Sequence, residues 1–250
     1  QYISIPKKYQ KEIKNFKSKK IEILDTFLHN KKLNIGDLKG NRFKINLHEL
    51  ELEELFHIEK LLKFVSKNGF PNYFGYQRFG KDVKENLEKA KDLLFGDAII
   101  KDRKVAKMLL SAYQSTFFNA WLVERLKLDN SGFKLLDGDI FYDIKNEKLF
   151  TPKSINEKII EDFKEKLITP TGLLPGRDVF KAKDDALKIE QKYDDSEITE
   201  KGYRREAVVF PEILSSKYDK LNKSCSLDFI LPKGSYATVL IELLANRNFG

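Results

Sequence analysis

Apolar residues recur at helical spacing over three stretches in the first half of the chain. Between about residues 50 and 66 they follow the three-to-four-residue period of an amphipathic helix, and residues 81–94 repeat this pattern. Asp102 then opens a broad apolar stripe that continues to Leu126. The pattern therefore predicts two helices of moderate length followed by a long one.

Shorter β-rich runs lie towards both ends of the chain, and the middle alternates short strands and turns with helical stretches. Strands are predicted at 2–5, 20–28, 42–47, 206–214 and 226–231, and short strands with turns at 140–150. Further helices are predicted at 156–168, 183–193 and 235–244. Residues 170–177 contain too much Pro and Gly for either regular element, so this segment is predicted to be a shaped loop.

Strands at both ends, with helices and mixed texture between them, indicate an α/β (α+β) fold interrupted by an insertion. We expect a core formed by residues 1–101 and 206–250, with an inserted domain at 102–205. The chain has 41% hydrophobic and 34% charged residues, which is typical of a globular protein that folds in water. No run approaches 18 consecutive apolar residues, so we expect neither a membrane-spanning helix nor a membrane partner.

Cysteine and histidine are scarce in this sequence. Cys225 is the one cysteine and cannot form a disulfide within the chain, so a reducing cytoplasm is the simplest location. His29, His48 and His57 lie far apart, without partners at metal-ligand spacing. We therefore expect no metal site.

The positive charge is concentrated at the N-terminal end. Residues 1–44 contain twelve Lys or Arg and four acids, so their net charge of +8 equals that of the whole chain. Such an excess attracts polyanions, most commonly the phosphate backbone of a nucleic acid. A solvated lysine-rich surface without a partner explains the charge equally well at this point.

The most unusual segment is 69–80, which contains five aromatic residues, three glycines, an Asn, a Gln and an Arg. Aromatic faces stack on unpaired bases, glycines let a ligand approach the backbone, and Arg contacts phosphates or base edges. An aromatic-rich turn that packs on the core is the alternative for this segment.

Within this segment, residues 72–80 read NYFGYQRFG and resemble the signature of the TruD family of transfer-RNA pseudouridine synthases. Four more segments resemble motifs of that family in the same order. They are LKGNRF at 38–43, LSAYQSTFFN at 110–119, TGLLPG at 171–176 and LPKGSYAT at 231–238. The resemblance spans residues 1–244.

The resemblance implies a pseudouridine-synthase-type mixed sheet with a TruD-specific insertion. It also implies a monomeric enzyme that isomerises uridine, at position 13 in the family, within transfer RNA and without a metal or organic cofactor. The target base would leave its stack, and an aspartate would act as the covalent catalyst.

The family's aspartate lies in a G-x-K-D motif that residues 1–250 lack. Asp82 follows Gly80 and Lys81, but it lies in the wrong place and is a weak substitute. We expect the catalytic aspartate before Gln1. A noncatalytic RNA-binding protein or RNA chaperone is the alternative, and a Gly-x-Lys-Asp segment before Gln1 would decide for the enzyme.

The resemblance also implies roles for individual residues. Asn72 would orient the catalytic carboxylate, and Phe74 would stack on the flipped uracil. The substrate pocket would be formed by Gln77, Arg78, Phe79, Ser235 and Tyr236. Gln77 and Arg78 would anchor the loop, and Arg78 would also reach a phosphate. A structural pairing of Arg78 with an acid is the alternative to that contact. The residues expected to contact the RNA backbone are Lys7, Lys8, Lys11, Lys39 and Arg42.

Overall fold

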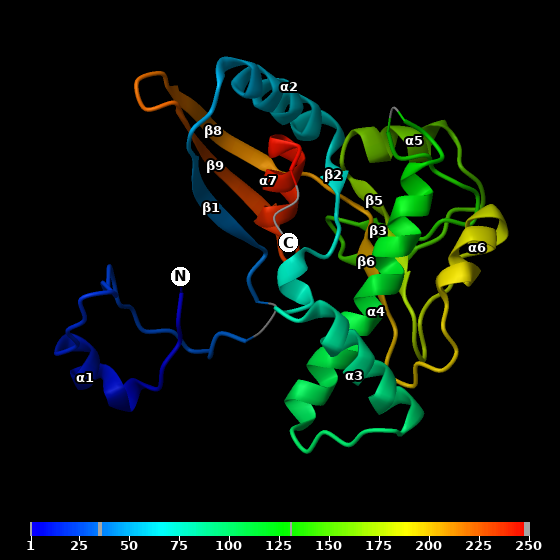
Figure 1. The fold of residues 1–250 in the computed structure, drawn as a ribbon, viewed down its shortest axis with the longest axis horizontal. Coiled ribbons are helices and arrows are strands. Elements are labelled where there is room, and N and C mark those ends of the chain that lie inside the picture. The colour runs from blue at the N-terminus through cyan, green and yellow to red at the C-terminus, as the bar shows by residue number, and fades with distance from the viewer. Residues whose placement is uncertain (1, 35–36, 131, 248–250) are drawn as a thin grey trace. The chain divides into compact units, whose positions relative to one another are not determined.

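The computed structural model describes residues 2–34, 37–130 and 132–247, and the chain divides into two compact units between Lys39 and Gly40. The first unit holds a 3-10 turn, η1 (Lys7–Tyr9), and the short helix α1 (Gln10–Lys14) (Figure 1). The rest of its described residues are irregular and mostly exposed.

The strands predicted at 2–5 and 20–28 are wrong. Both segments are irregular, and apolar side chains such as Ile21, Ile23 and Phe27 are exposed. Alternation in a sequence indicates which side chains would share a face, but a strand also needs a hydrogen-bonded neighbour. Within the described ranges, no strand pairs with either segment.

The second unit contains a three-stranded antiparallel sheet in the order β1-β9-β8. Its strands are β1 (Gly40–Leu47), β8 (Glu212–Asp219) and β9 (Ser224–Pro232), which confirms the strands predicted at 42–47 and 226–231. Gly40 lies opposite Pro232, and Leu47 lies opposite Cys225. The central strand β9 alternates between faces, so one face is apolar and buried.

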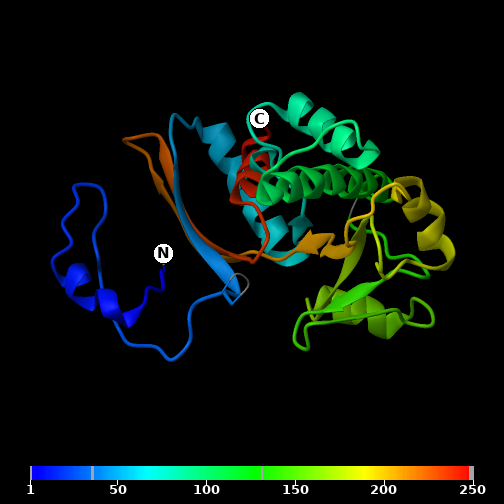
Figure 2. The same ribbon diagram turned by 90° about the horizontal axis from the view of Figure 1, so that it is seen from below.

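Two helices, α2 (Leu52–Asn68) and α7 (Ala237–Ala245), cover this buried face, and Figure 2 shows them on the same side of the sheet. Glu51 and Glu54 form a capping box that satisfies backbone N–H groups at the start of α2. The shared core is formed by Leu55, Ile58, Leu62 and Val65 of α2, by Cys225, Leu227, Phe229 and Leu231 of β9, and by Leu240 and Leu244 of α7.

A second antiparallel sheet has the order β4-β3-β5-β6. Its strands are β3 (Phe141–Asp143), β4 (Lys148–Phe150), β5 (Ile168–Leu174) and β6 (Tyr203–Glu206). All four lie between residues 141 and 206, and the insertion expected at 102–205 stays a prediction. The mixed α/β architecture itself is confirmed.

The shaped loop predicted at 170–177 is wrong for most of its length, because residues up to Leu174 belong to β5. Every residue of β5 is buried. Pro170 lacks an N–H, but its carbonyl accepts a hydrogen bond of 2.7 Å from the backbone N–H of Ala207. Gly172 lies where the ring of Trp121 approaches the strand. Pro170 and Gly172, which argued against a strand, thus each have a specific place in one, whereas Pro175 and Gly176 lie beyond its end.

The strand predicted at 206–214 is divided among three sheets. Its first residue ends β6, Val208–Val209 forms β7, and β8 begins at Glu212. Strand β7 pairs with β2 (Phe70–Pro71) in a two-stranded ladder. Because the chain changes sheets here, this segment connects the two larger sheets.

The long helix α4 (Arg103–Leu126) packs against β5, and Figures 1 and 2 show it in green beside the second sheet. The side chain of Asp102 caps it by accepting from the N–H of Lys104 at 2.8 Å, an interaction typically worth about 1 kcal/mol. Phe118, Trp121 and Leu122 of α4 are fully buried against β5 and the chain around Val208.

Three further helices agree with predicted ones to within a few residues. They are α3 (Val83–Phe95), α5 (Glu157–Lys164) and α6 (Asp184–Glu190), the last followed by η3 (Gln191–Tyr193). The 3-10 turn η2 (Tyr76–Arg78) lies in the segment 69–80, where no helix was predicted. Helix α3 packs against α4. In the part of the chain that the structure describes, no helix has the length and apolar character needed to cross a membrane.

The contact at Gly172 gives a first prediction. A β-carbon at this position would lie 2.3 Å from Trp121 Cζ3 and 2.8 Å from Phe118 Cε2. Gly172→Ala should lower the free energy of unfolding by about 1–3 kcal/mol through overpacking, as measured by urea denaturation. Gly132→Ala is the matched control, since no atom lies within 4 Å of its added β-carbon. Equal stability of the two variants would contradict this packing.

The buried ion pair between Arg125 and Asp139 gives a second prediction. Their side chains are 0% and 2% exposed, and two hydrogen bonds of 2.6 and 2.8 Å join them. Asp139→Ala leaves a buried charge unpaired and should lower the free energy of unfolding by about 3–5 kcal/mol. Lys158→Ala, which breaks the exposed pair with Asp162, should change it by less than about 1 kcal/mol. A small effect at Asp139 would refute a structural role for the pair.

Candidate active site

Helix α4 joins three of the five motif segments of the sequence. Its residues 110–119 accept hydrogen bonds from Arg78, and Asn119 both accepts from and donates to the backbone of Phe74 in the aromatic segment 69–80. Gln114 of the same stretch donates to the carbonyl of Pro175 at 2.7 Å, which fixes the end of β5. Segments that lie far apart in the sequence are thus held against one helix.

Phe74 lies at the centre of this region and is half-buried. Asn119 holds its backbone on both sides, since Oδ1 accepts from the N–H of Phe74 at 2.9 Å and Nδ2 donates to its carbonyl at 3.0 Å. The ring meets the edges of Phe118 and Tyr236, with centroid distances of 5.6 and 6.1 Å. The ring is therefore fixed in place without being fully covered.

Asn72 is 2% exposed, and its side chain is held from two sides. Its Nδ2 donates to the carbonyl of Glu206 at 3.0 Å, and its Oδ1 accepts from Arg205 Nη2 at 2.7 Å. An Asn side chain has two N–H donors, so one remains for a further acceptor. Asn72 and Phe74 both contact Arg205, and the expectation that they form one site stays a prediction.

Arg78 anchors the aromatic segment to α4. Its Nε donates to Ser115 Oγ at 3.1 Å, and its Nη2 donates to the carbonyl and hydroxyl of Ser111. These partners are neutral oxygens, whereas an acid was the expected structural alternative. The guanidinium also lies 5.3 Å from the centroid of Phe74. A contact between Arg78 and a phosphate stays a prediction.

The neighbours of Arg78 differ in exposure. Gln77 is exposed, and Phe79 is half-buried. The carbonyl of Phe79 accepts from Asn86 Nδ2 at 2.9 Å, which ties the segment to α3. The structure therefore brings Phe79 into the folded loop and leaves the side chain of Gln77 at the surface.

The segment before α7 closes one side of the region. Gly75 lies so close to it that a β-carbon there would be 2.9 Å from Thr238 Oγ1 and 3.3 Å from the ring of Tyr236. Ser235 and Tyr236 are half-buried. The hydroxyls of Ser235 and Thr238 are buried without a hydrogen-bond partner in the described residues. Tyr236 thus lies in the same site as Phe74.

Strand β1 adjoins the start of the segment 231–238, which leads into α7. A β-carbon on Gly40 would lie 2.4 Å from the carbonyl oxygen of Leu231. Arg42 is exposed and forms two hydrogen bonds, of 2.7 and 2.5 Å, with Asp228. This guanidinium lowers the pKa of the Asp228 carboxyl, chiefly through the hydrogen bond. A phosphate that binds Arg42 would compete with this ion pair.

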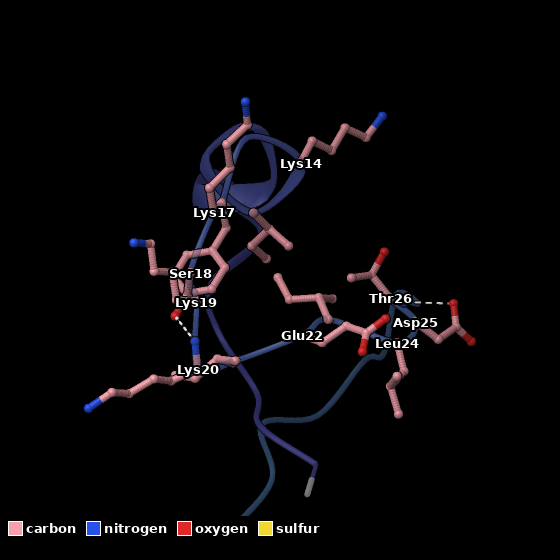
Figure 3. Close-up of a pocket in the computed structure, with 13 residues that line it drawn as sticks. Lys14, Lys17, Ser18, Lys19, Lys20, Glu22, Leu24, Asp25 and Thr26 are labelled. Carbon is pink, nitrogen blue, oxygen red and sulfur yellow. Dashed lines mark hydrogen bonds between the residues drawn. The ribbon is translucent and has the colours of Figure 1, made fainter.

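The first unit carries four of the basic residues expected to contact RNA. Lys7 and Lys8 lie in η1, Lys11 lies in α1, and these residues and Lys39 are exposed. A pocket of about 950 Å³ lies within this unit and is lined by residues 13–14 and 16–26 (Figure 3). The lysine side chains labelled in Figure 3 extend away from its centre, and none of the predicted site residues lines it.

Among the described residues, no group of three or more His, Cys, Asp or Glu is placed to hold a metal ion. The site consists instead of aromatic rings, amides, hydroxyls and guanidinium groups.

Sequence reasoning missed Arg205 and the role of Asn119. Arg205 is 8% exposed, and its Cζ lies 3.9 Å from the centroid of the Phe74 ring. Burial lowers the pKa of Arg205 to about 10, while Glu206 opposes this shift. The available signal for a site residue was the pair of adjacent arginines shortly before Val208. The partner of Arg205, Asn72, lies 133 positions away in the sequence, so the contact could not be predicted from local pattern.

Comparison with known proteins identifies the family to which this chain is similar. The family model described as tRNA pseudouridine synthase D (TruD) matches residues 1–100 and 97–243. A protein named tRNA pseudouridine synthase D from a Nitratiruptor species is 37% identical over 275 residues, covering 99% of this chain and 76% of the relative. The protein of that name from Campylobacter jejuni is 33% identical over 281 residues, covering 99% and 75%.

A solved structure agrees with these sequence matches. The putative tRNA pseudouridine synthase D (TruD) from Methanosarcina mazei superposes with a TM-score of 0.63 and 21% identity, covering 95% of this chain and 76% of that one. This likeness shows a shared fold and confirms the expected fold class. Together, the family model and the relatives above 30% identity show that this chain belongs to the TruD family.

Proposed function

We propose that the protein is an isomerase that converts uridine to pseudouridine in transfer RNA, at position 13 as expected for the family. Relatives whose names state this activity align along 99% of the chain. The observation that carries the proposal is the half-buried Phe74 ring, held by Asn119 beside Asn72 and Tyr236. Such a ring offers a stacking surface for one unpaired base.

The reaction rearranges the nucleoside without oxidation or reduction. The bond from ribose C1′ to uracil N1 breaks, a bond from C1′ to C5 forms, C5 loses a proton and N1 carries one in the product. This balance requires no metal or organic cofactor. In the proposed mechanism an aspartate located before Gln1 acts as the covalent catalyst, on either the base or the sugar.

The target base must leave its stack before this chemistry can begin. We propose that the flipped uracil stacks against Phe74, with Tyr236 and Ser235 walling the pocket. The free N–H of Asn72 Nδ2 would donate to the catalytic carboxylate and orient it, since the other N–H is occupied by the carbonyl of Glu206.

Affinity for transfer RNA would come from the basic residues outside the pocket. Lys7, Lys8, Lys11 and Lys39 are exposed, and lysine contacts with phosphates raise affinity without selecting a sequence. Arg42 would join them only by exchanging its bond to Asp228 for a phosphate. A monomer in the cytoplasm is the simplest setting for this activity, and it remains part of the proposal.

The test measures pseudouridine in transfer RNA taken from a strain that lacks the enzyme, after incubation with the full-length protein. Pseudouridine at position 13 is the expected result. Phe74→Ala removes the stacking surface and should lower the rate by about 10- to 100-fold, the equivalent of one lost base–aromatic stack.

Phe95→Ala is the matched control, because it removes a ring that is 61% exposed at the end of α3. Its rate should equal that of the unaltered protein. Retained binding of transfer RNA without any pseudouridine would reject the enzyme and favour the noncatalytic RNA-binding alternative.

The lysines of the first unit give a prediction about salt dependence. Replacing Lys7, Lys8 and Lys11 together by Ala should weaken transfer-RNA binding. It should also reduce the slope of log Kd against log salt concentration by about one for each lysine that contacts a phosphate. Filter binding over a range of salt concentrations measures both quantities.

A second triple variant controls for net charge. Lys158, Lys188 and Lys223 are exposed lysines of the other unit, and each is already paired with an acid. Replacing these three by Ala removes the same charge and should leave the slope nearly unchanged. Equal slopes for both triple variants would show that the basic N-terminal segment has no specific contact with the RNA.

A further inference from the structure

Arg205 of β6 uses its hydrogen-bond donors to join two segments of the proposed uridine site. Its Nε donates to the carbonyl of Asn72 at 2.9 Å, and its Nη2 donates to the side-chain oxygen of the same residue at 2.7 Å. Its Nη1 donates to the carbonyl of Gly234 at 3.0 Å. One guanidinium therefore fixes both the backbone and the amide of Asn72 relative to the segment that carries Tyr236.

The guanidinium carbon of Arg205 also lies over the ring of Phe74. The distance of 3.9 Å from Cζ to the ring centroid is shorter than the 5.3 Å from Arg78. A guanidinium at this distance interacts favourably with the π system, most strongly where water is excluded. Arg205 thus sets the position of Asn72 through its hydrogen bonds and that of the Phe74 ring through this contact.

The charge of Arg205 distinguishes it from two other buried arginines. Arg125 pairs with Asp139, and Arg204 pairs with Glu190 at 2.6 Å. The acceptors that Arg205 meets in the described residues are carbonyl and amide oxygens. Burying a guanidinium without a carboxylate partner is unfavourable. A purely structural tie between two loops would not require a charge here.

We propose that Arg205 is a positioning residue of the uridine site, which acts on the reaction through Asn72 and Phe74 without touching the RNA. This inference rests on the proposed function, because its effect is on the rate of isomerisation. If Arg205 bound RNA directly, its loss would raise the Kd for transfer RNA. If it only stabilised the fold, its loss would lower the thermal stability and leave the rate constant of the folded protein unchanged.

The test uses the full-length protein and measures two quantities, the single-turnover rate constant for pseudouridine formation and the Kd for transfer RNA. Arg205→Met keeps the length of the side chain but removes the charge and all donors, and it should lower the rate constant by about 100-fold with Kd unchanged. Arg205→Lys keeps the charge but lacks the planar set of N–H donors. Its rate constant should therefore fall between those of the unaltered protein and Arg205→Met. Arg247→Met, which breaks an exposed pair with Glu54, is the control and should match the unaltered protein.

A double-mutant cycle identifies the route of the effect. If Arg205 acts through Asn72, then Asn72→Ala combined with Arg205→Met should be no slower than the slower of the two single variants. Losses that multiply would overturn the proposal, as would a rise in Kd that accounts for the lost rate. If Arg205→Met does not fold, as judged by its thermal unfolding, then Arg205→Lys takes its place in the cycle.

The results of these experiments distinguish a failure of the Arg205 proposal from a failure of the proposed isomerase activity. Normal rate constants for the Arg205 variants, with pseudouridine formed by the unaltered protein, would overturn the role of Arg205 alone. No pseudouridine from the unaltered protein would overturn the proposed function, and the inference with it.

Discussion

The close approach of α4 to β5 at Gly172 is the contact on which the rest of the site depends. The ring of Trp121 occupies the space that any larger residue at position 172 would need. This contact allows α4 to lie directly on a fully buried strand. The same helix then presents Ser111, Ser115 and Asn119 to the aromatic segment. Loops that would otherwise be free in solution are thus positioned by one rigid, well-packed element.

Buried charge has two different roles in the second unit. The pairs Arg125–Asp139 and Arg204–Glu190 are almost completely removed from water, and each satisfies further groups of the backbone. They fix the second sheet and the end of α4. Arg205 follows Arg204 directly but faces neutral oxygens and an aromatic ring. Because adjacent residues of a strand point to opposite faces, one arginine serves the sheet and the next serves the site.

Local pattern alone was enough to predict the longer helices, because each buries one face and shows it at a period near 3.6 residues. The short elements η1 and α1 bury no residue and were not predicted. Leu55, Ile58, Leu62 and Val65 of α2 are an example. Motif resemblance pointed to residues 72–80 as the candidate site, and the roles of its residues stay predictions. Strand β5 was missed because Pro170 and Gly172 disfavour strands on average, and only the packing of Trp121 and the bond from Ala207 explain them. Arg205 was missed because its partners lie far away in sequence, and the strands at 2–5 and 20–28 failed because alternation cannot supply a pairing partner.

The register of β9 has a consequence for how this chain can change in length. Gly40 opposes Pro232, and the segment that carries Tyr236 follows within four residues. A strand advances about 3.3 Å per residue and reverses its faces at each step. One residue inserted in β9 before Leu227, with the preceding residues still paired, would therefore turn Leu227 and Phe229 out of the core and shift Tyr236 relative to Phe74. The turn at 220–223, where Leu221 is 95% exposed, lies beyond the paired residues and can absorb an insertion without either effect. Peptide tags and natural length variation in this hairpin belong at that turn.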